Sequence, residues 1–362
     1  MENQPTQPAR RRTRARWVRA VCILLALALV AAAVAYNLLQ RQAYTSATFA
    51  MDAMVSQTAY GPGAQRAMQQ VNLALAEYEQ EFSLYSETGD VARINEAAGK
   101  GGADVSPRTA ALIQQATQLS AQSKGAFAIS IAPLTLAWGI TSGSPRVPSQ
   151  QEIDSLLPLV NDDAIQVEGT HVALAKEGLA LDLGAIAKGA ACTEMAAIYA
   201  QNGVKSALLS IGGSSIYALG TKPDGTQYRV GFRDPAGGGS AYIASFALQN
   251  QSISVSGGYE RYFVQNGKTY IHILNPLTGY PVESDIASVG VIHPDGAVAE
   301  FYSTTLFIWG VEEALEYMRG GGAAIVLDTA GNLYVSASLE EGFQLHQQAE
   351  SSYNLTFVEA AN

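Results

Sequence analysis

Cysteine is scarce in this sequence, with only Cys22 and Cys192 among 362 residues. Cys22 stands at the start of a long apolar run, whereas the cysteine of a lipoprotein would follow such a run. Cys192 is the one thiol of the remaining chain, so it has no partner for a disulfide or for a cysteine-based metal site. The sequence therefore excludes a disulfide framework and a cysteine metal centre.

Basic residues are also few outside the N-terminus. Residues 1–41 contain seven of the 22 Lys and Arg residues and one acid, Glu2. The rest of the chain has 15 basic and 31 acidic residues, a net charge of −16. Nucleic-acid binding needs patches of Lys and Arg that neutralise phosphates. This charge balance excludes nucleic acid as a partner.

The glycine-rich phosphate motifs are missing as well. No Gly-x-Gly-x-x-Gly follows a predicted strand, and the segment 267–269, Gly-Lys-Thr, has Tyr262 where a phosphate loop needs its first glycine. A phosphate site in this chain would therefore have to combine a metal ion with a helix N-terminus.

Charge and hydropathy change abruptly near the N-terminus. Six arginines between Arg10 and Arg19 precede the uncharged apolar run 20–39. Twenty residues are enough to cross the hydrocarbon core of a bilayer as a helix. The basic residues before the run predict a cytoplasmic N-terminus and an exported body.

The run 20–39 is interpreted as an anchor or as a cleaved signal peptide. Small residues at 33–35 offer a cleavage site, but the apolar run continues through 36–39, which favours the anchor. We expect a basic cytoplasmic segment 1–19, a transmembrane anchor or signal segment 20–39, and one exported domain, 45–362. The protein is then a single-pass membrane protein with an extracytoplasmic body.

The exported body has the periodicity of an α+β fold, with helices packed on mixed sheets. Its expected helices are 64–83, 106–123, 185–202 and 297–309. The second begins with Ser106-Pro107, and the third stops at Gly203. The segments 125–133, 179–183 and 206–213 are expected strands, a hairpin is expected over 164–174, and further short strands reach residue 292.

Glu300, Ser303 and Thr304 lie three and four residues apart within the predicted helix 297–309. This spacing places their side chains on one helix face. Oxygen ligands of this kind suit Mg²⁺, whose shell is often completed by substrate phosphates. The alternative is a helix with one exposed acid and two hydroxyls and no ligand.

Three other titratable residues have two interpretations each. Asp182 and Lys188 flank the start of the predicted helix 185–202. In one interpretation Asp182 caps the helix and Lys188 is a solvated charge; in the other, both side chains contact a ligand. His272 lies between two isoleucines. It is interpreted either as a core histidine or as a general base that is neutral near physiological pH.

In this order, the segments 181–189, 270–279 and 299–304 resemble the signature blocks of the ApbE family, the FAD:protein FMN transferases. The resemblance extends from about Met51 to Gly310. It implies an ApbE-like, T-fold-like catalytic domain that takes FAD as its substrate and Mg²⁺ as its cofactor.

The resemblance also implies a role for individual residues. Mg²⁺ would be held by three helical side chains and one backbone oxygen, those of Glu300, Ser303, Thr304 and Ala185. The catalytic residues would be His272, as the general base, and Asp182. The residues that would bind the flavin nucleotide are Met51, Tyr85, Ala126, Phe127, Ala128, Asp182, Lys188 and His272. Among them, Tyr85 would stack on the isoalloxazine ring.

The sequence departs from the family pattern at several of these blocks. Met51 is followed by Asp52-Ala53 where the family has Gly-Thr. Four further positions carry a residue other than the usual aspartate: Ala128, Thr193, Asn275 and Glu300.

The expected function is that of an exported, membrane-tethered enzyme. It would transfer FMN from FAD onto a threonine or serine hydroxyl of an exported acceptor protein that carries a flavinylation motif, and release AMP. Two alternatives are an FAD pyrophosphatase, in which water replaces the acceptor hydroxyl, and a non-catalytic protein that binds or traffics FAD.

Overall fold

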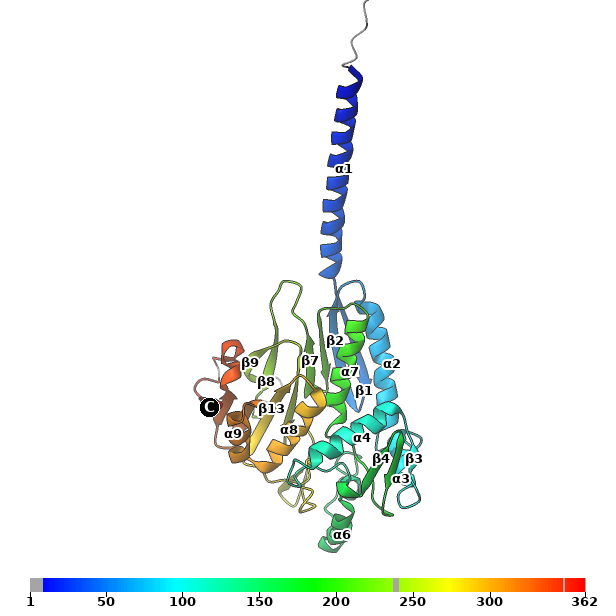
Figure 1. Ribbon diagram of the computed structural model, residues 1–362. Helices are drawn as coiled ribbons and strands as arrows, with labels where there is room; N and C mark the ends of the chain where they lie inside the picture. The colour runs from blue at the N-terminus through cyan, green and yellow to red at the C-terminus, as the bar shows by residue number, and fades with distance from the viewer. Residues whose placement is uncertain (1–8, 237–240, 348, 362) are drawn as a thin grey trace, which may run out of the picture.

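One long helix, α1 (Ala9–Gln40), projects from one end of the molecule (Figure 1). The computed structural model describes residues 9–236, 241–347 and 349–361. Within α1, the stretch Arg16–Gln40 is long and apolar enough to cross a membrane, and its most apolar part is not buried against the body. The predicted run 20–39 lies inside this helix, and the first strand of the body begins at Ala43.

The body is built around a nine-stranded sheet with the order β1-β2-β6-β7-β10-β13-β14-β15-β17. All neighbours are antiparallel except β15 and β17. Its strands are β1 (Ala43–Ala50), β2 (Ala53–Tyr60), β6 (Ala207–Ile211), β7 (Ser215–Leu219), β10 (Gln251–Gly257), β13 (Ile286–His293), β14 (Ala323–Asp328), β15 (Asn332–Ser336) and β17 (Asn354–Val358). Sheets with packed helices confirm the predicted α+β class.

Helices cover one face of this sheet (Figure 1). They contact one another in the order α2 (Ala64–Phe82), α7 (Ala187–Gln201), α8 (Gly296–Trp309) and α9 (Val311–Arg319). Successive side chains of a strand point to opposite faces. Accordingly, Val291 packs in the cluster under α8, whereas Ile292 packs in the cluster on the other face.

The opposite face carries a second, three-stranded sheet with the order β16-β9-β8. Its strands are β8 (Tyr228–Arg233), β9 (Tyr242–Leu248) and β16 (Gln344–Leu345), and η3 (Ala337–Gly342) precedes β16. Phe232 and Phe246 of this sheet are buried against Ile253 and its neighbours in the main sheet. The protein therefore has three layers here.

The remaining elements form a lobe and a hairpin next to the helices. The lobe contains α3 (Asp90–Glu96), β3 (Ala103–Asp104), α4 (Pro107–Ser120), α5 (Ala132–Trp138), α6 (Gln150–Leu156), η1 (Leu157–Leu159), η2 (Asp162–Ala164), β4 (Ile165–Glu168) and β5 (His171–Leu174). The hairpin is β11 (Tyr262–Gln265) and β12 (Lys268–Ile271). Nε1 of Trp138 donates to the carbonyl oxygen of Gly279 at 2.8 Å, which joins the lobe to the chain that follows β12.

Most predicted elements are confirmed. The four predicted helices correspond to α2, α4, α7 and α8, and the hairpin 164–174 corresponds to β4 and β5. Ser106 caps α4 as expected, because its side chain accepts from the N–H of Thr109. Gly203 has φ +73, the left-handed conformation expected of a helix stop.

Two predicted strands are wrong. The segment 125–133 is a turn that runs into α5, and 179–183 forms only an isolated bridge between Ile131 and Ala180. Backbone groups that a strand would pair are bound elsewhere: the N–H groups of Ile129 and Ser130 donate to the carboxylate of Asp162. Apolar alternation cannot reveal a partner 32 residues away.

Candidate active site

His272 follows directly on β12 and is half-buried. Its backbone N–H and its ring Nδ1 lie 3.0 and 3.2 Å from the carbonyl oxygen of Arg261. We therefore assign the ring proton to Nδ1, which leaves Nε2 as the free acceptor. Burial lowers the pKa of His272 to about 4, and the positive charges of Lys188 and Arg261 act in the same direction. The ring is neutral at physiological pH and can accept a proton.

Lys188 and Glu300 join the helices α7 and α8. Nζ of Lys188 lies 2.6 Å from Oε1 of Glu300, and it also donates to the carbonyl oxygen of Gly184. Oε2 of Glu300 accepts from the backbone N–H of Gly189. Both carboxylate oxygens of Glu300 therefore have a hydrogen-bond or ion-pair partner. The residue is only 5% exposed, so these contacts are largely shielded from solvent. The alternative of an exposed helix acid is wrong for Glu300, and Lys188 is not a solvated charge.

Two glycines allow α7 and α8 to approach this closely. A Cβ on Gly189 would lie 2.0 Å from the carbonyl oxygen of Gly296, and one on Gly296 would lie 2.1 Å from the carbonyl oxygen of Gly189. No side chain can be accommodated at such distances. The close crossing therefore brings the first turn of α7, with Lys188, against Glu300.

A group of hydroxyls lies beside Glu300. Oγ of Ser303 is 3.0 Å from Oγ of Ser256 in β10, and Oγ1 of Thr304 is 3.5 Å from the same atom. Ser303 also donates to the carbonyl oxygen of Glu300. The hydroxyls of Ser303 and Thr304 therefore converge on Ser256, whereas the carboxylate of Glu300 binds Lys188 and the N–H of Gly189. That these side chains hold one metal ion stays a prediction.

The carboxylate of Glu300 and the three hydroxyls are all oxygen donors, the ligand type that a magnesium site uses. Among the described residues, no cluster of three His, Cys, Asp or Glu side chains forms another candidate metal site. A cation already contacts the carboxylate, because the ammonium of Lys188 lies against Glu300. Ala185, whose backbone oxygen was the fourth predicted ligand, lies in the turn before α7. The donors fit a hard cation.

Asp182 closes the turn that precedes α7. Its Oδ1 accepts from the N–H of Gly184 at 2.8 Å, and its Oδ2 accepts from Oγ1 of Thr135 at 3.0 Å. The residue at the N-cap of α7 is Ile186, which makes no side-chain cap. The interpretation of Asp182 as the helix cap is therefore wrong, and the carboxylate is tied to the lobe through α5.

Tyr85 lies next to this acid and is 49% exposed. Its hydroxyl is 2.6 Å from Oγ1 of Thr141. Partial burial raises the pKa of Tyr85, and the negative charge of Asp182 contributes to the rise. An exposed ring fixed by its hydroxyl offers one face for stacking. Tyr85 is thus placed so that it could stack on a flat ring, and its role in flavin binding stays a prediction.

The predicted flavin loop 126–128 is mostly buried. The side chains of Ala126 and Phe127 are each 3% exposed, and only Ala128 is half-buried. Phe127 packs edge to face on Phe301, with ring centroids 5.0 Å apart. These two side chains face the core beside α8, so any contact with a ligand would have to come from their backbone or from Ala128.

Met51 and Asp52 form the tight turn between β1 and β2, with φ of 54 and 53. Nη1 of Arg261 lies 2.7 Å from Oδ2 of Asp52, and Nη2 donates to the carbonyl oxygen of Asp52. Sequence reasoning did not single out Arg261. The one feature near it in the sequence is Gly257-Gly258. Its contact with Asp52 spans 209 residues, so the spacing of residues in the sequence could not predict that contact.

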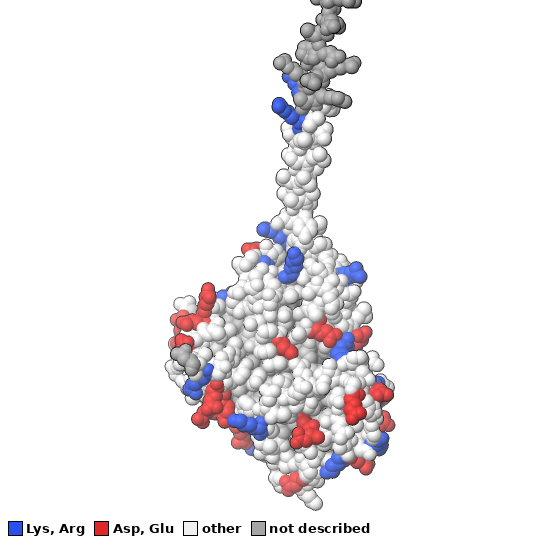
Figure 2. Space-filling model, in the orientation of Figure 1, with Lys and Arg blue, Asp and Glu red and all other residues white. Residues whose placement is uncertain are grey.

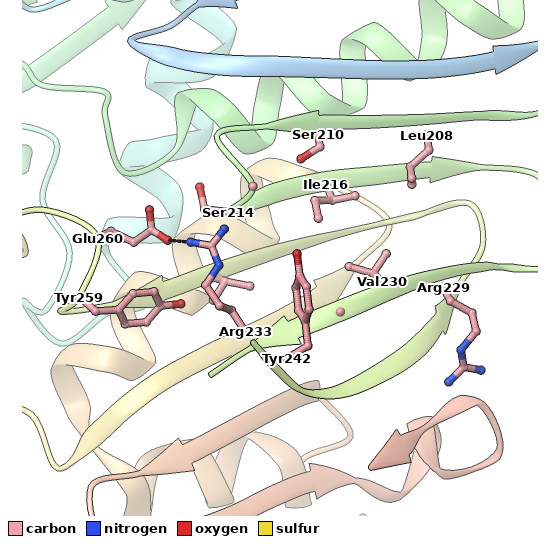
Figure 3. Close-up of a pocket in the computed structure, with 13 residues that line it drawn as sticks. Leu208, Ser210, Ser214, Ile216, Arg229, Val230, Arg233, Tyr242, Tyr259 and Glu260 are labelled. Atoms are coloured by element: carbon pink, nitrogen blue, oxygen red, sulfur yellow. Dashed lines mark hydrogen bonds and ion pairs between the residues drawn. The ribbon is translucent and has the colours of Figure 1, made fainter. Parts of the chain in front are cut away.

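A cavity of about 230 Å³ lies between the main sheet and β8–β9, and Glu260 is one of its lining residues (Figure 3). Figure 3 shows Arg233, Tyr242 and Tyr259 pointing into it, and Nη1 of Arg233 lies 3.1 Å from Oε1 of Glu260. Glu260 precedes Arg261 in the chain. Its lining residues do not include His272, Lys188 or Glu300, and the cavity was not predicted from the sequence.

Comparison with known proteins places these residues in a family. The family model described as "ApbE family" matches residues 51–327. An FAD:protein FMN transferase of Klebsiella pneumoniae is 34% identical over 244 residues, which are 67% of this chain and 75% of that protein. One of Treponema pallidum is 30% identical over 268 residues, which are 70% of this chain and 74% of that protein.

Solved structures agree with this result. The apo form of the flavinyl transferase ApbE of Pseudomonas stutzeri has a TM-score of 0.72 and 27% identity, and the match covers 86% of this chain and 97% of that one. The ApbE protein of Thermotoga maritima has a TM-score of 0.72 and 25% identity, with 86% and 100% covered. The chain belongs to the ApbE family.

Proposed function

We propose that this protein transfers FMN from FAD onto a threonine or serine hydroxyl of an acceptor protein and releases AMP. The observation that carries the proposal is the position of His272: a neutral imidazole with a free Nε2, close to Lys188, which itself pairs with Glu300. The relatives from Klebsiella and Treponema, both FAD:protein FMN transferases, support the same reaction.

In the proposed step, Nε2 of His272 takes the proton of the acceptor hydroxyl, and the oxygen of that hydroxyl attacks the FMN-side phosphorus of FAD. A new oxygen–phosphorus bond forms, and the bond from that phosphorus to the bridging oxygen breaks, so AMP departs with the electron pair. The ammonium of Lys188 and the guanidinium of Arg261 lie beside His272, where they would offset the charge of the pyrophosphate. Positioning and charge stabilisation dominate such a phosphoryl transfer.

Mg²⁺ would be held by Glu300, Ser303 and Thr304, with the backbone oxygen of Ala185 as a further ligand. When bound, it would neutralise pyrophosphate oxygens that the protein cations alone leave charged. Ser256 is within hydrogen-bond reach of both hydroxyls and would orient them. Asp182 and Tyr85 would position the flavin half, together with Met51 and the 126–128 loop.

The location of the protein follows from α1. We infer that this helix anchors it, uncleaved, in the cell membrane, with the arginine-rich segment in the cytoplasm and the body outside. The acceptor is then an exported or membrane protein that carries a flavinylation motif.

The test mixes the purified full chain with FAD, Mg²⁺ and an acceptor that carries such a motif, followed by denaturing electrophoresis. Flavin fluorescence that stays on the acceptor band supports transfer, and an acceptor with its hydroxyl residue replaced by alanine should stay dark. Free FMN and AMP without a labelled acceptor would instead identify an FAD pyrophosphatase. FAD that binds and is recovered unchanged would identify a carrier.

A further inference from the structure

A second cavity, of about 220 Å³, lies where α1 joins the body. One wall is formed by Asn37 and Gln40 in the last turn of α1 and by Arg41, which follows the helix. The loops that connect α7 to β6 and β7 to β8 form the other wall, and they contribute Lys205 and Lys222. This cavity is separate from the one lined by Arg233 and Glu260, because the two share no lining residue.

The charge of this cavity is opposite to that of the body. Three of its nine described lining residues are cations, Arg41, Lys205 and Lys222, and none is an acid. The chain after residue 41 carries a net charge of −16. Figure 2 shows blue side chains around the base of the helix, whereas most red side chains lie farther down the body.

Within the described part of the chain, none of the three cations takes part in an ion pair. Nζ of Lys222 lies 5.9 Å from the centroid of the Tyr228 ring. The nearest acid in the chain is Asp224, whose Oδ1 accepts from the N–H and the hydroxyl of Thr226 in the same loop. Three positive charges that no described ion pair neutralises therefore line the cavity.

The cavity is held at a fixed place relative to α1. The helix ends at Gln40 and β1 begins at Ala43, so only two residues separate them. The N–H of Gly61 donates to the carbonyl oxygen of Gln42 at 3.1 Å, which ties this junction to the end of β2. A Cβ on Gly220 would lie 2.0 Å from the carbonyl oxygen of Lys205, so the two basic loops also touch.

The position of this cavity relative to the membrane follows from the length of the helix. At about 1.5 Å per residue, the 20-residue run 20–39 spans roughly 30 Å, the thickness of the hydrocarbon core. If this run crosses the core, Arg41 begins the headgroup layer. The cavity then opens at the level of lipid phosphates, and its cations meet them directly.

We propose that this cavity binds the headgroup phosphate of an anionic phospholipid, with Arg41, Lys205 and Lys222 as the contacts. The proposal rests on the inference that α1 spans the membrane. A lipid held there would fix the orientation of the body about the helix. Because β1 rises by about 3.4 Å per residue over eight residues, the Asp52 turn would stand roughly 27 Å from the headgroups.

The test uses the full chain in detergent, with phosphatidylglycerol or phosphatidylcholine added and bound lipid counted by native mass spectrometry. The variant is Lys205→Gln with Lys222→Gln. The matched control is Lys100→Gln with Lys176→Gln, which removes the same charge from exposed positions near β3 and β5. We expect the variant to bind phosphatidylglycerol roughly 10-fold to 30-fold more weakly and the control to change less than about twofold.

Three results would overturn the proposal. Equal affinity for phosphatidylcholine would mean that the charge of the lipid is not recognised, and an equal loss in the control would mean that total charge decides. Displacement of the lipid by glycerol phosphate at a similar concentration would identify a site for free phosphates. Extraction of native membranes with alkaline carbonate tests the anchor itself, so a failure of the anchor is distinguished from a failure of the lipid site.

Discussion

Nη1 of Arg261 lies 2.7 Å from the carboxylate of Asp52, in the turn between β1 and β2. The backbone carbonyl of the same arginine faces Nδ1 of His272. Asp52 therefore fixes the residue that orients the proposed base, although it does not touch the base itself. It acts as a positioning residue, at a place where the family pattern has glycine.

Replacing Asp52→Asn should lower kcat for flavin transfer by roughly 10-fold, because a misplaced base loses its alignment with the hydroxyl. KM for FAD should change much less. The pair is exposed, with Asp52 68% and Arg261 41% accessible, so stability should change by less than about 1 kcal/mol. Steady-state kinetics and thermal melting separate the two effects.

The control for this variant is Glu283→Gln. It removes an ion pair of similar length, because Oε1 of Glu283 lies 2.6 Å from Nζ of Lys268. Lys268 is on β12, the strand that leads to His272. Transfer should stay near the wild-type rate. If both variants lose activity equally, the hairpin matters as a whole and Asp52 has no special role.

His272→Ala should bind FAD and lose turnover by a factor of about 10² to 10⁴, the usual contribution of a general base. Fluorescence titration with FAD and a single-turnover transfer assay measure the two properties. His171→Ala, at a half-buried position in β5 where the ring contacts Asp104, is the control. Normal transfer by the His272 variant, or its failure to fold, would favour a structural histidine.

The low pKa of His272 predicts a pH dependence with a definite sign. The unfolded chain binds a proton at this residue near pH 6.5 and the folded chain only near pH 4. Between these values the unfolded state holds more protons, so stability falls as the pH falls from 6.5 to 4 and is unaffected above 6.5. NMR titration of the ring should give a midpoint near 4, and a midpoint at 6.5 would contradict the buried environment.

The sequence predicted the local parts of this site better than its assembly. Glu300, Ser303 and Thr304 share a helix turn, so helical periodicity alone grouped them. Lys188 meets Glu300 across 112 residues because two glycines let the helices touch, and no periodicity encodes that crossing. The resemblance to a family assigned Lys188 to the flavin nucleotide and Glu300 to the metal, so it did not predict their ion pair either.

The two wrong strands have the same explanation. Residues 125–133 alternate like a strand, yet the backbone of Ile129 and Ser130 is bound by Asp162, and Asp182 donates its N–H to the carbonyl oxygen of Ile129. Side-chain partners distant in sequence replaced a ladder of strand hydrogen bonds. The segment that precedes α7 is irregular for this reason, and it is part of the candidate site.

The topology proposed for α1 predicts the result of proteolysis. Protease added to cells whose outer barrier has been removed should degrade the body and leave a short N-terminal stub, because the arginine cluster keeps the N-terminus in the cytoplasm. A cytoplasmic protein of similar size serves as the control for intact membranes. Protection of the body until lysis would reverse the inferred orientation.

Glu300 is the residue whose substitution best separates metal binding from structure. Glu300→Gln keeps the shape and removes the charge, so Mg²⁺ affinity and transfer should fall together, and excess Mg²⁺ should restore part of the activity. It also leaves Lys188 beside a neutral amide in a buried place, so the melting temperature should fall without metal. Glu312→Gln, an exposed acid in α9, should change none of these.

Glu300→Asp completes the test, because it restores the acid that the family usually carries. The shorter side chain suits the tight octahedral shell of Mg²⁺, so binding and transfer should equal or exceed those of the wild type. Isothermal titration with Mg²⁺ gives a readout that is independent of turnover. If Glu300→Gln binds Mg²⁺ as the wild type does, Glu300 serves only as the partner of Lys188 and Gly189. The metal ligands would then have to lie elsewhere, nearer to Asp182.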